Sequence, residues 1–421
     1  MLYKLAAVLA TFITIPFMVS YLGAEKFGVW ATMLTLISWV MLFDFGIGSG
    51  LKNKITESLG KNERKAAASY ISTSYAVIGG ISVLLFFFFS LAAYWAPWQR
   101  VFNTKTISES TLRTAVITLS FFVFLNFWIS LVNQIYHGIQ KSSIVVLGQF
   151  FSNTLALILV YLLHSFAEPS LIYIVIAYGV SLVTANAALS VFLFRRHKDF
   201  LPSPALFKKN QIEPLLSLGL KFFVIQFAVI LIFMTDKILI SQLLGPASVT
   251  PYEIVFKLFS VFTVFHSIVL TPLWPAYSDA YTKNDMVWIR KQLKRQIFIA
   301  IAIFFGAFVL VILGPTLIKI WIGDDIHISY LMYIFFGIFI CVSVWSNVFA
   351  YFVNAIGRLN VQLSTAIIAA LLNVPLSIIF VKVYGMGSEG ILLATIISLS
   401  IYAVVGPIDV YRITRARRIN E

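Results

Sequence analysis

Long apolar runs separated by short polar segments dominate the sequence. A helix that crosses a bilayer needs about 20 mainly apolar residues. Dividing the chain at glycine, proline and charge clusters gives twelve such runs: 2–20, 27–47, 70–95, 114–136, 144–164, 170–194, 215–240, 251–275, 296–320, 328–354, 361–383 and 390–411. The segments between them are too short for a separate soluble domain. The pattern therefore predicts an all-α polytopic membrane protein.

The basic residues orient these spans. Twelve spans place both termini on one side of the membrane, and 23 of the 31 lysines and arginines lie on that side, against six on the other. Because basic residues concentrate on the cytoplasmic side, we expect both termini in the cytoplasm. The same distribution accounts for most of the formal net charge of +14. The charge therefore indicates contact with anionic membrane lipids, and no nucleic-acid partner is expected.

Composition and motifs exclude several classes of protein. Hydrophobic residues make up 60% of the chain and charged residues 11%, against about 25% charged in soluble domains. The single cysteine, Cys341, excludes an intrachain disulfide and disfavours a cysteine-rich metal site. The sequence contains no H-E-x-x-H, G-x-S-x-G or Walker A pattern. We therefore expect a transporter and not an enzyme, with no catalytic residue, metal or other cofactor.

Two halves of the chain resemble each other. A Leu-Gly turn follows the first span at Gly23 and the seventh at Gly245, and the pairs Gly138/Gly357 and Asn153/Asn373 have nearly the same separation. Duplication predicts two six-helix lobes, residues 1–200 and 201–421. They would be parallel repeats about an axis along the membrane normal, an arrangement known in transporters. The alternative is that such turns recur by chance.

Charged residues within spans point to function. An ionised side chain at a helix centre costs at least about 2.5–3.5 kcal/mol, so it needs a partner or a wet cavity. Asp236, Lys237 and Lys257 are such residues, and Asp236 and Lys257 lie at similar depth on consecutive spans. We expect these two to meet and to line a cavity. In the alternative, Lys257 pairs locally with Glu253, four residues earlier, and Lys237 extends outward.

Other polar residues have two interpretations. Asp44 precedes a glycine-rich run at residues 46–50, which predicts a hinge or tight exit into a basic amphipathic stretch at residues 51–65. For His266, within the eighth span, a satisfied packing role is favoured over a proton relay. Several asparagines within spans either join helices by hydrogen bonds or line a polar cavity: Asn126, Asn133, Asn153, Asn347, Asn354 and Asn373.

Specific segments resemble a known family. They are YLGAEKFGVW at 21–30, DFGIG at 44–48 with Leu51 and Asn53, YIST at 70–73, DKILIS at 236–241 and TPLWPAY at 271–277. These resemble bacterial polysaccharide transporters, the O-antigen type oligosaccharide-lipid flippases of the multidrug/oligosaccharidyl-lipid/polysaccharide exporter (MOP) superfamily. The likeness covers essentially the whole chain.

The resemblance implies a function. It implies two lobes around a cavity lined by spans 1, 2, 7 and 8, working by alternating access. The substrate would be an undecaprenyl-diphosphate-linked oligosaccharide, such as an O-antigen unit of lipopolysaccharide. It would move from the cytoplasmic to the periplasmic leaflet of the bacterial inner membrane. A glycan polymerase and other assembly proteins would be partners.

The resemblance also suggests roles for residues. Lys4, Lys237 and Lys257 are the basic residues of the cavity-lining spans that could face a diphosphate, with Asn133 and Asn153 as further substrate contacts. Ion-gradient coupling or ion pairing would involve four residues: Asp236, Asp44, Glu253 and His266. The alternative function is a cation-coupled exporter of drugs or small molecules in the same superfamily.

Overall fold

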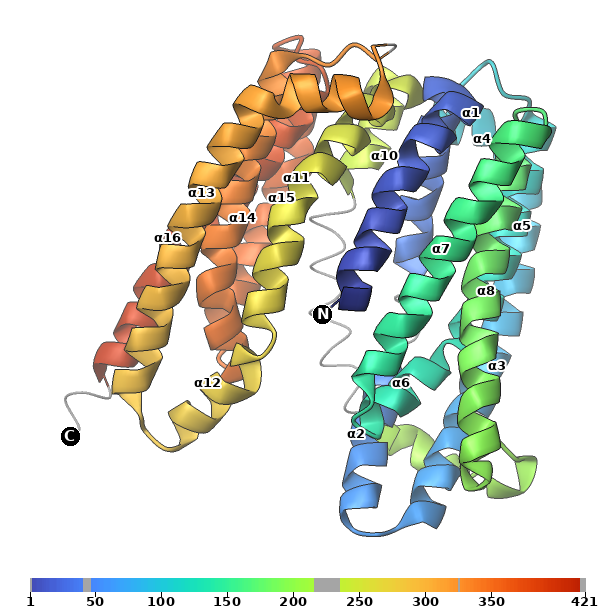
Figure 1. The fold of residues 1–421 in the computed structure, drawn as a ribbon, viewed down its shortest axis with the longest axis vertical. Coiled ribbons are helices and arrows are strands. Elements are labelled where there is room, and N and C mark those ends of the chain that lie inside the picture. The colour runs from blue at the N-terminus through green and yellow to red at the C-terminus, as the bar shows by residue number, and fades with distance from the viewer. Residues whose placement is uncertain (1, 41–46, 216–234, 325, 417–421) are drawn as a thin grey trace. The chain divides into compact units, whose positions relative to one another are not determined.

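The computed structural model describes residues 2–40, 47–215, 235–324 and 326–416. Within these ranges, ten helices are long and apolar enough to cross a membrane (Figure 1). The all-α polytopic prediction is therefore confirmed. The predicted spans 2–20 and 27–47 both begin within a single helix, α1 (Leu2–Val40). Most of the predicted span 215–240 lies outside the described residues. The total of twelve spans stays a prediction.

The chain forms two compact units, Met1–Phe227 and Ala228–Glu421, here called the N-terminal and C-terminal units. Residues 201–215, which were expected to begin the second lobe, belong to the first unit. The short helices of this segment pack on α3. The two predicted six-helix lobes, residues 1–200 and 201–421, stay a prediction.

The N-terminal unit is a helical bundle. Within it α1 packs against α7, α5 against α3 and α8, and α2 against α3 and α6. Its elements are α1 (Leu2–Val40), α2 (Ile47–Gly60), α3 (Arg64–Trp95), α4 (Trp98–Phe102), α5 (Glu109–Ile129), α6 (Leu131–Gly138), α7 (Ser142–Phe166), α8 (Leu171–Arg196) and the 3₁₀ turns η2 (Lys198–Phe200), η3 (Pro204–Leu206) and η4 (Lys209–Gln211).

The C-terminal unit is a second bundle. Its α16 packs against α15 and α14, and α14 packs against α11 and α13. Its described elements are α10 (Thr235–Leu244), η5 (Pro246–Ser248), α11 (Val249–Leu270), α12 (Leu273–Thr282), α13 (Met286–Ile322), α14 (Tyr330–Ala355), α15 (Asn360–Lys382) and α16 (Ser388–Ala416).

The two Leu-Gly turns share an unusual backbone conformation. Gly23 interrupts α1 with φ 71° and ψ 167°, and Gly245 follows α10 with φ 91° and ψ 157°. This region is open almost only to glycine. A Cβ added at either glycine would meet no atom within 4 Å. The requirement for glycine is therefore conformational at both turns, as duplication predicts.

The correspondence continues to the ends of α2 and α12. Asn62 and Asn284, both with φ 61°, follow these helices. Just before them, Lys61 bonds to Glu57 and Lys283 to Asp279, each at 2.8 Å. The numbering offset between these matched residues equals that between Gly23 and Gly245. The internal repeat therefore gains structural support.

The expected match of Gly138 with Gly357 is in the wrong register. Gly357 has a left-handed backbone, φ 72°, whereas in the N-terminal unit Gln140 takes that conformation, φ 59°. When Gln140 is matched with Gly357, the backbone hydrogen bond from Lys141 N to Tyr136 O corresponds to the one from Arg358 N to Val353 O. Gly138 has a different role, because a Cβ there would lie 2.8 Å from Ile55. It allows α6 to approach α2.

The predicted amphipathic stretch, residues 51–65, overlaps α2 as far as Gly60 and then runs into the start of α3 at Arg64. Leu51 and Ile55 are fully buried, while Lys61 is exposed. The hinge predicted for residues 46–50 is wrong for residues 47–50, which form the first turn of the helix. A Cβ at Gly50 would lie 2.4 Å from the carbonyl oxygen of Leu215. Glycine is needed there for close packing. Asp44 lies outside the described residues.

Candidate functional site

Two contacts connect α10 to α11 in the C-terminal unit. Tyr252 Oη donates to Asp236 Oδ2 at 2.7 Å, and Lys237 Nζ lies 2.6 Å from Glu253 Oε2. Asp236 and Lys237 are neighbours on α10, and their partners Tyr252 and Glu253 are neighbours on α11. Neighbouring residues of a helix point about 100° apart, since a turn holds 3.6 residues. Asp236 and Lys237 therefore point in different directions, and the carboxylates of Asp236 and Glu253 bind different partners.

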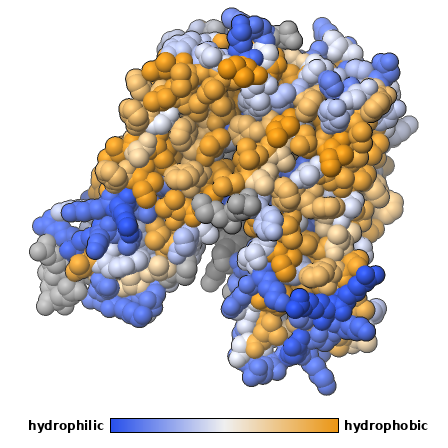
Figure 2. All heavy atoms as spheres, viewed as in Figure 1, coloured by the Kyte–Doolittle hydropathy of each residue, from blue (hydrophilic) through white to orange (hydrophobic). Residues whose placement is uncertain are grey.

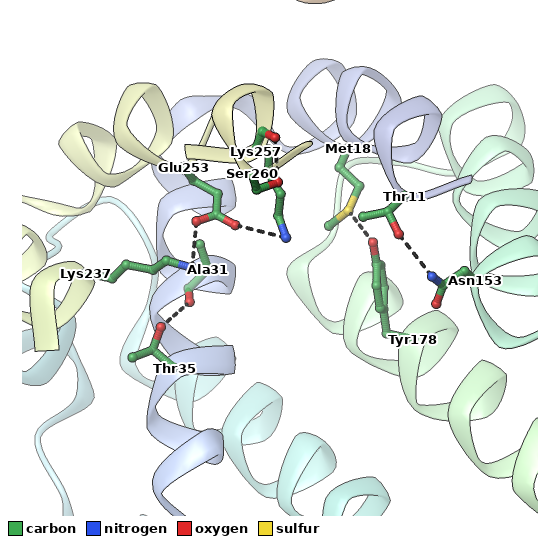
Figure 3. Close-up of polar contacts among 10 residues, drawn as sticks. All are labelled: Thr11, Met18, Ala31, Thr35, Asn153, Tyr178, Lys237, Glu253, Lys257 and Ser260. Carbon is green, nitrogen blue, oxygen red and sulfur yellow. Dashed lines mark hydrogen bonds and ion pairs between the residues drawn. The ribbon is translucent and has the colours of Figure 1, made fainter. Parts of the chain in front are cut away.

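Glu253 is shared by two lysines. Lys257 Nζ lies 3.7 Å from Glu253 Oε1, so the carboxylate lies between Lys237 and Lys257 (Figure 3). The Glu253 side chain is 9% exposed, against 18% for Lys237 and 32% for Lys257. We call these three residues the charged cluster. The cluster holds two cations and one anion, and Asp236, the neighbour of Lys237 in the chain, is a second carboxylate.

The partly exposed side of the cluster is cationic. Lys237 Nζ also lies 5.9 Å from the centroid of the Phe256 ring, within the range of a cation–π contact. Lys257 has the longer ion-pair distance and the more exposed side chain of the two lysines. It is thus the member most available to a further anion.

Asp236 lies in a separate buried network. The residue is 3% exposed. Thr395 Oγ1, on α16, lies 2.9 Å from Asp236 Oδ1 and 3.0 Å from Oδ2. Asn373 Nδ2, on α15, donates to Thr395 Oγ1 at 2.8 Å. We call Asp236, Tyr252, Thr395 and Asn373 the Asp236 network, which joins four helices of the unit.

The expected pairing of Asp236 with Lys257 is wrong. In the described structure Asp236 accepts bonds from Tyr252 and Thr395, and Lys257 pairs with Glu253 on its own helix. The local alternative is confirmed. The alternative for Lys237 is wrong, because its amino group contacts Glu253. Asp236 and Lys257 lie at a similar depth in the membrane, but depth alone does not specify which helix faces oppose each other.

The asparagines of the N-terminal unit join helices. Asn153 Nδ2 on α7 donates to Ala7 O (2.9 Å) and lies 3.1 Å from Thr11 Oγ1, both on α1 (Figure 3). Asn133 Nδ2 donates to Asn186 Oδ1 at 3.0 Å, and Asn186 Nδ2 donates to Asn126 Oδ1 at 2.7 Å. The helix-joining interpretation is confirmed for these residues. Substrate contact by Asn133 or Asn153, and by the half-buried Lys4, stays a prediction.

His266 is buried within α11, at 1% exposure. Neither ring nitrogen has a hydrogen-bond partner among the described residues. Its packing position agrees with the favoured interpretation, but the expectation of a satisfied imidazole is wrong. Nothing in the described structure connects it to the charged cluster.

Sequence reasoning missed three members of these networks. Tyr252 precedes Glu253 and could have been considered with it. Thr395 gave no signal, since it is 159 positions from Asp236. Asn186 lies in an otherwise apolar span, and its polarity alone could have marked it as a helix-joining residue.

Known families and structures match this chain. A model for the family described as polysaccharide biosynthesis protein matches residues 1–281, and the MatE model matches residues 222–379. A Salmonella typhimurium protein assigned as an O-antigen transporter is 24% identical, covering 92% of this chain and 89% of its own. A Yersinia pseudotuberculosis protein assigned as an O-antigen export protein is 22% identical, with 85% and 82% coverage.

Solved structures show the same fold. An inward-facing multidrug resistance MATE family transporter of the MOP superfamily gives a TM-score of 0.79 at 15% identity, covering 99% of this chain and 98% of its own. A MOP superfamily transporter from Pyrococcus furiosus gives 0.61 at 15% identity, with 99% and 97% coverage. The resemblance seen in the sequence is confirmed. The chain belongs to the polysaccharide biosynthesis protein family, a family of membrane transporters with the MATE-like fold.

Proposed function

We propose that the protein is a flippase for an undecaprenyl-diphosphate-linked oligosaccharide. It transfers an O-antigen or similar repeat unit from the cytoplasmic to the periplasmic leaflet of the bacterial inner membrane. The family match and the O-antigen assignments of the Salmonella and Yersinia relatives support this class of substrate. Twelve spans in two six-helix lobes, with both termini in the cytoplasm and alternating access between leaflets, complete the proposal.

The observation that carries the proposal is the pair of partly exposed lysines in the charged cluster. A diphosphate entering a membrane loses hydration, and this cost must be offset by cations and hydrogen bonds. Lys237 and Lys257 share the Glu253 carboxylate, and Lys257 has the longer ion-pair distance and the more exposed side chain, so it is the lysine most available to a phosphate. Lysine supplies a point charge on a flexible stem, which suits a phosphate that must be released again.

The Asp236 network is proposed to couple transport to an ion gradient. Asp236 is the carboxylate that holds α10, α11 and α16 together through Tyr252 and Thr395. Protonation would weaken these charge-assisted hydrogen bonds. A change in the protonation of one residue would thereby change the packing of several helices, as alternating access requires.

A cation-coupled exporter of drugs or small molecules is the second candidate, because the MATE family transporter with a TM-score of 0.79 is a multidrug resistance protein. The charged cluster weighs against it. A cationic substrate would be repelled by the lysines, whereas an anionic lipid headgroup would be attracted. The partly exposed lysines therefore favour the flippase.

Deletion of the gene tests the proposed function. We expect a lipid-linked oligosaccharide to accumulate on the cytoplasmic leaflet, with loss of the corresponding surface glycan. The wild-type gene should restore both. Normal surface glycan, with altered resistance to cationic drugs, would contradict the flippase and support the second candidate.

Asp236→Asn tests the coupling residue. The amide retains the size of the carboxylate but cannot titrate. Transport by wild-type protein should respond to a pH gradient, and transport by the variant should lose most of that response. An unchanged response to the gradient would remove Asp236 from coupling.

A further inference from the structure

A pocket lies within the N-terminal unit, apart from the charged cluster. It has a volume of about 730 Å³, within the usual range of roughly 300–1,000 Å³ for ligand pockets. Its walls come from α3, α5, α8 and the segment at residues 202–207. The lining is almost wholly apolar, with aromatic contributions from Tyr75, Trp128, Phe194 and Phe207. An apolar chain is therefore the kind of ligand that would fit.

One wall of the pocket is fixed by hydroxyl groups of α3. Ser72 Oγ accepts a hydrogen bond from Ser203 N at 3.1 Å, and Thr73 Oγ1 accepts one from Lys208 N at 3.1 Å. Ser69 Oγ donates to Leu206 O at 2.7 Å. These bonds attach the segment after α8 to the bundle. The pocket is thus preformed, which reduces the ordering cost of binding.

The rim of the pocket is apolar and exposed. Val191 is 50% exposed and Phe207 is 41% exposed, and both line the pocket. Val191 lies about 7.5 Å before the end of α8 at 1.5 Å per residue, still within a candidate membrane span. Apolar surface exposed at this depth contacts lipid tails. The rim is therefore suited to receiving a chain from the adjacent leaflet.

Basic residues follow the lining residues in the sequence. Arg195 and Arg196 come directly after Phe194, and Lys208 and Lys209 directly after Phe207. All four are exposed, and none forms an ion pair with an acidic residue in the described parts of the chain. Figure 2 shows hydrophilic side chains gathered at the lower end of the N-terminal unit, below the hydrophobic band.

We propose that this pocket binds an anionic phospholipid of the leaflet at the basic end of the unit, which is the expected cytoplasmic leaflet. One acyl chain fills the apolar pocket, and the phosphate lies near Arg195, Arg196, Lys208 and Lys209. Basic sites between membrane helices bind anionic headgroups in this way. The site lies in a different unit from the charged cluster and is independent of the transported substrate.

Native mass spectrometry of the full-length protein in detergent tests the site. Phosphatidylglycerol and phosphatidylcholine with identical acyl chains are titrated separately. Ala187→Phe places a ring in the pocket, whereas Ala188→Phe, at the exposed next position of α8, is the matched control. We expect Ala187→Phe to reduce retention of phosphatidylglycerol about tenfold, as expected when the binding volume is lost. Ala188→Phe should leave retention unchanged.

A second variant tests the headgroup contact without changing the bundle. Substituting Arg195, Arg196, Lys208 and Lys209 by Gln should abolish most of the preference for phosphatidylglycerol over phosphatidylcholine, by about tenfold or more, because several charges act together. Gln at the exposed Lys291 and Lys294 is the control. Because the four substituted residues are exposed, this variant stays informative if Ala187→Phe does not fold.

Three results would overturn the proposal. The first is equal retention of phosphatidylglycerol by the Ala187→Phe and Ala188→Phe proteins when both are folded. The second is an unchanged lipid preference after removal of the four basic side chains. The third is displacement of phosphatidylglycerol by equimolar undecaprenyl phosphate, which would assign the pocket to a polyprenyl chain.

Discussion

The two units have matching turns but different polar chemistry inside the membrane. They agree at the turn glycines, Gly23 and Gly245, and at the exposed ion pair that ends α2 and α12. Counting from these glycines, each charged or network residue of α10 and α11 has a neutral counterpart in α1. The matched pairs are Asp236/Thr14, Lys237/Ile15, Tyr252/Trp30, Glu253/Ala31 and Lys257/Thr35.

Among the described residues, the two threonine counterparts bond within their own helix. Thr14 Oγ1 donates to Ala10 O at 2.7 Å, and Thr35 Oγ1 donates to Ala31 O at 3.1 Å (Figure 3). The same kind of helix pair is therefore built in the N-terminal unit without charged residues at these positions. We infer that the charges of the C-terminal unit are not required to form its helices and serve transport instead.

The largest expected effect comes from breaking the charged cluster at one point. Glu253→Ala leaves two lysines without their carboxylate, and loss of one partner of a buried pair costs about 3–5 kcal/mol. Thermal unfolding of the purified protein should show a large decrease in stability. Asp279→Asn removes a carboxylate four residues before a lysine at an exposed site, and should cost less than about 1 kcal/mol.

Equal stability of the two variants would contradict the burial assigned to Glu253. It would also remove the distinction between the interior of the C-terminal unit and its surface.

The Asp236 network should be the next most sensitive. Thr395→Val removes the hydroxyl that bonds to Asp236 and Asn373, and hydrogen bonds to charged groups contribute about 1.5–3 kcal/mol. Thr14→Val removes a hydroxyl whose bond in the described structure is to its own helix, so its effect on the free energy of unfolding should be much smaller. Similar effects of the two substitutions would argue against an inter-helix role for Thr395.

The turn glycines should show equal effects in the two units. Gly23→Ala and Gly245→Ala place a side chain in a conformation that costs roughly 1–3 kcal/mol, with no steric clash at either site. Thermal unfolding should show comparable losses. A loss at only one site would weaken the structural case for duplication.

The smallest effect concerns the exposed ion pairs. Hydrogen bonding from Lys61, supported by Lys54, lowers the pKa of the Glu57 carboxyl to about 2, against about 4.3 for an unperturbed glutamate. The contribution of Glu57 to stability is therefore complete above about pH 4.3 and is lost as the pH falls through about 2. Glu57→Gln should slightly lower the melting temperature at pH 6, with a smaller difference from wild type at pH 3. A constant difference would contradict the lowered pKa.

The sequence predicted the parts of the fold that depend on local pattern. The length of the apolar runs located the described spans, and the Leu-Gly turns marked Gly23 and Gly245. Helical spacing offered the Glu253–Lys257 pair as the alternative to a pairing of Asp236 with Lys257. It failed where the answer depends on which helix faces oppose each other. Asp236 was matched by depth to Lys257, although its partners are Tyr252 and the distant Thr395.

The most direct test gives the C-terminal unit the neutral residues of the N-terminal unit. The variant Lys237→Ile/Glu253→Ala/Lys257→Thr removes the charged cluster as a whole, and replacing a complete buried ion cluster by neutral groups is often tolerated. Wild-type and variant proteins would be reconstituted in liposomes, and translocation of an undecaprenyl-diphosphate-linked oligosaccharide measured. The account predicts a stably folded variant whose translocation falls to the protein-free background. Translocation at the wild-type rate by the folded variant would contradict it.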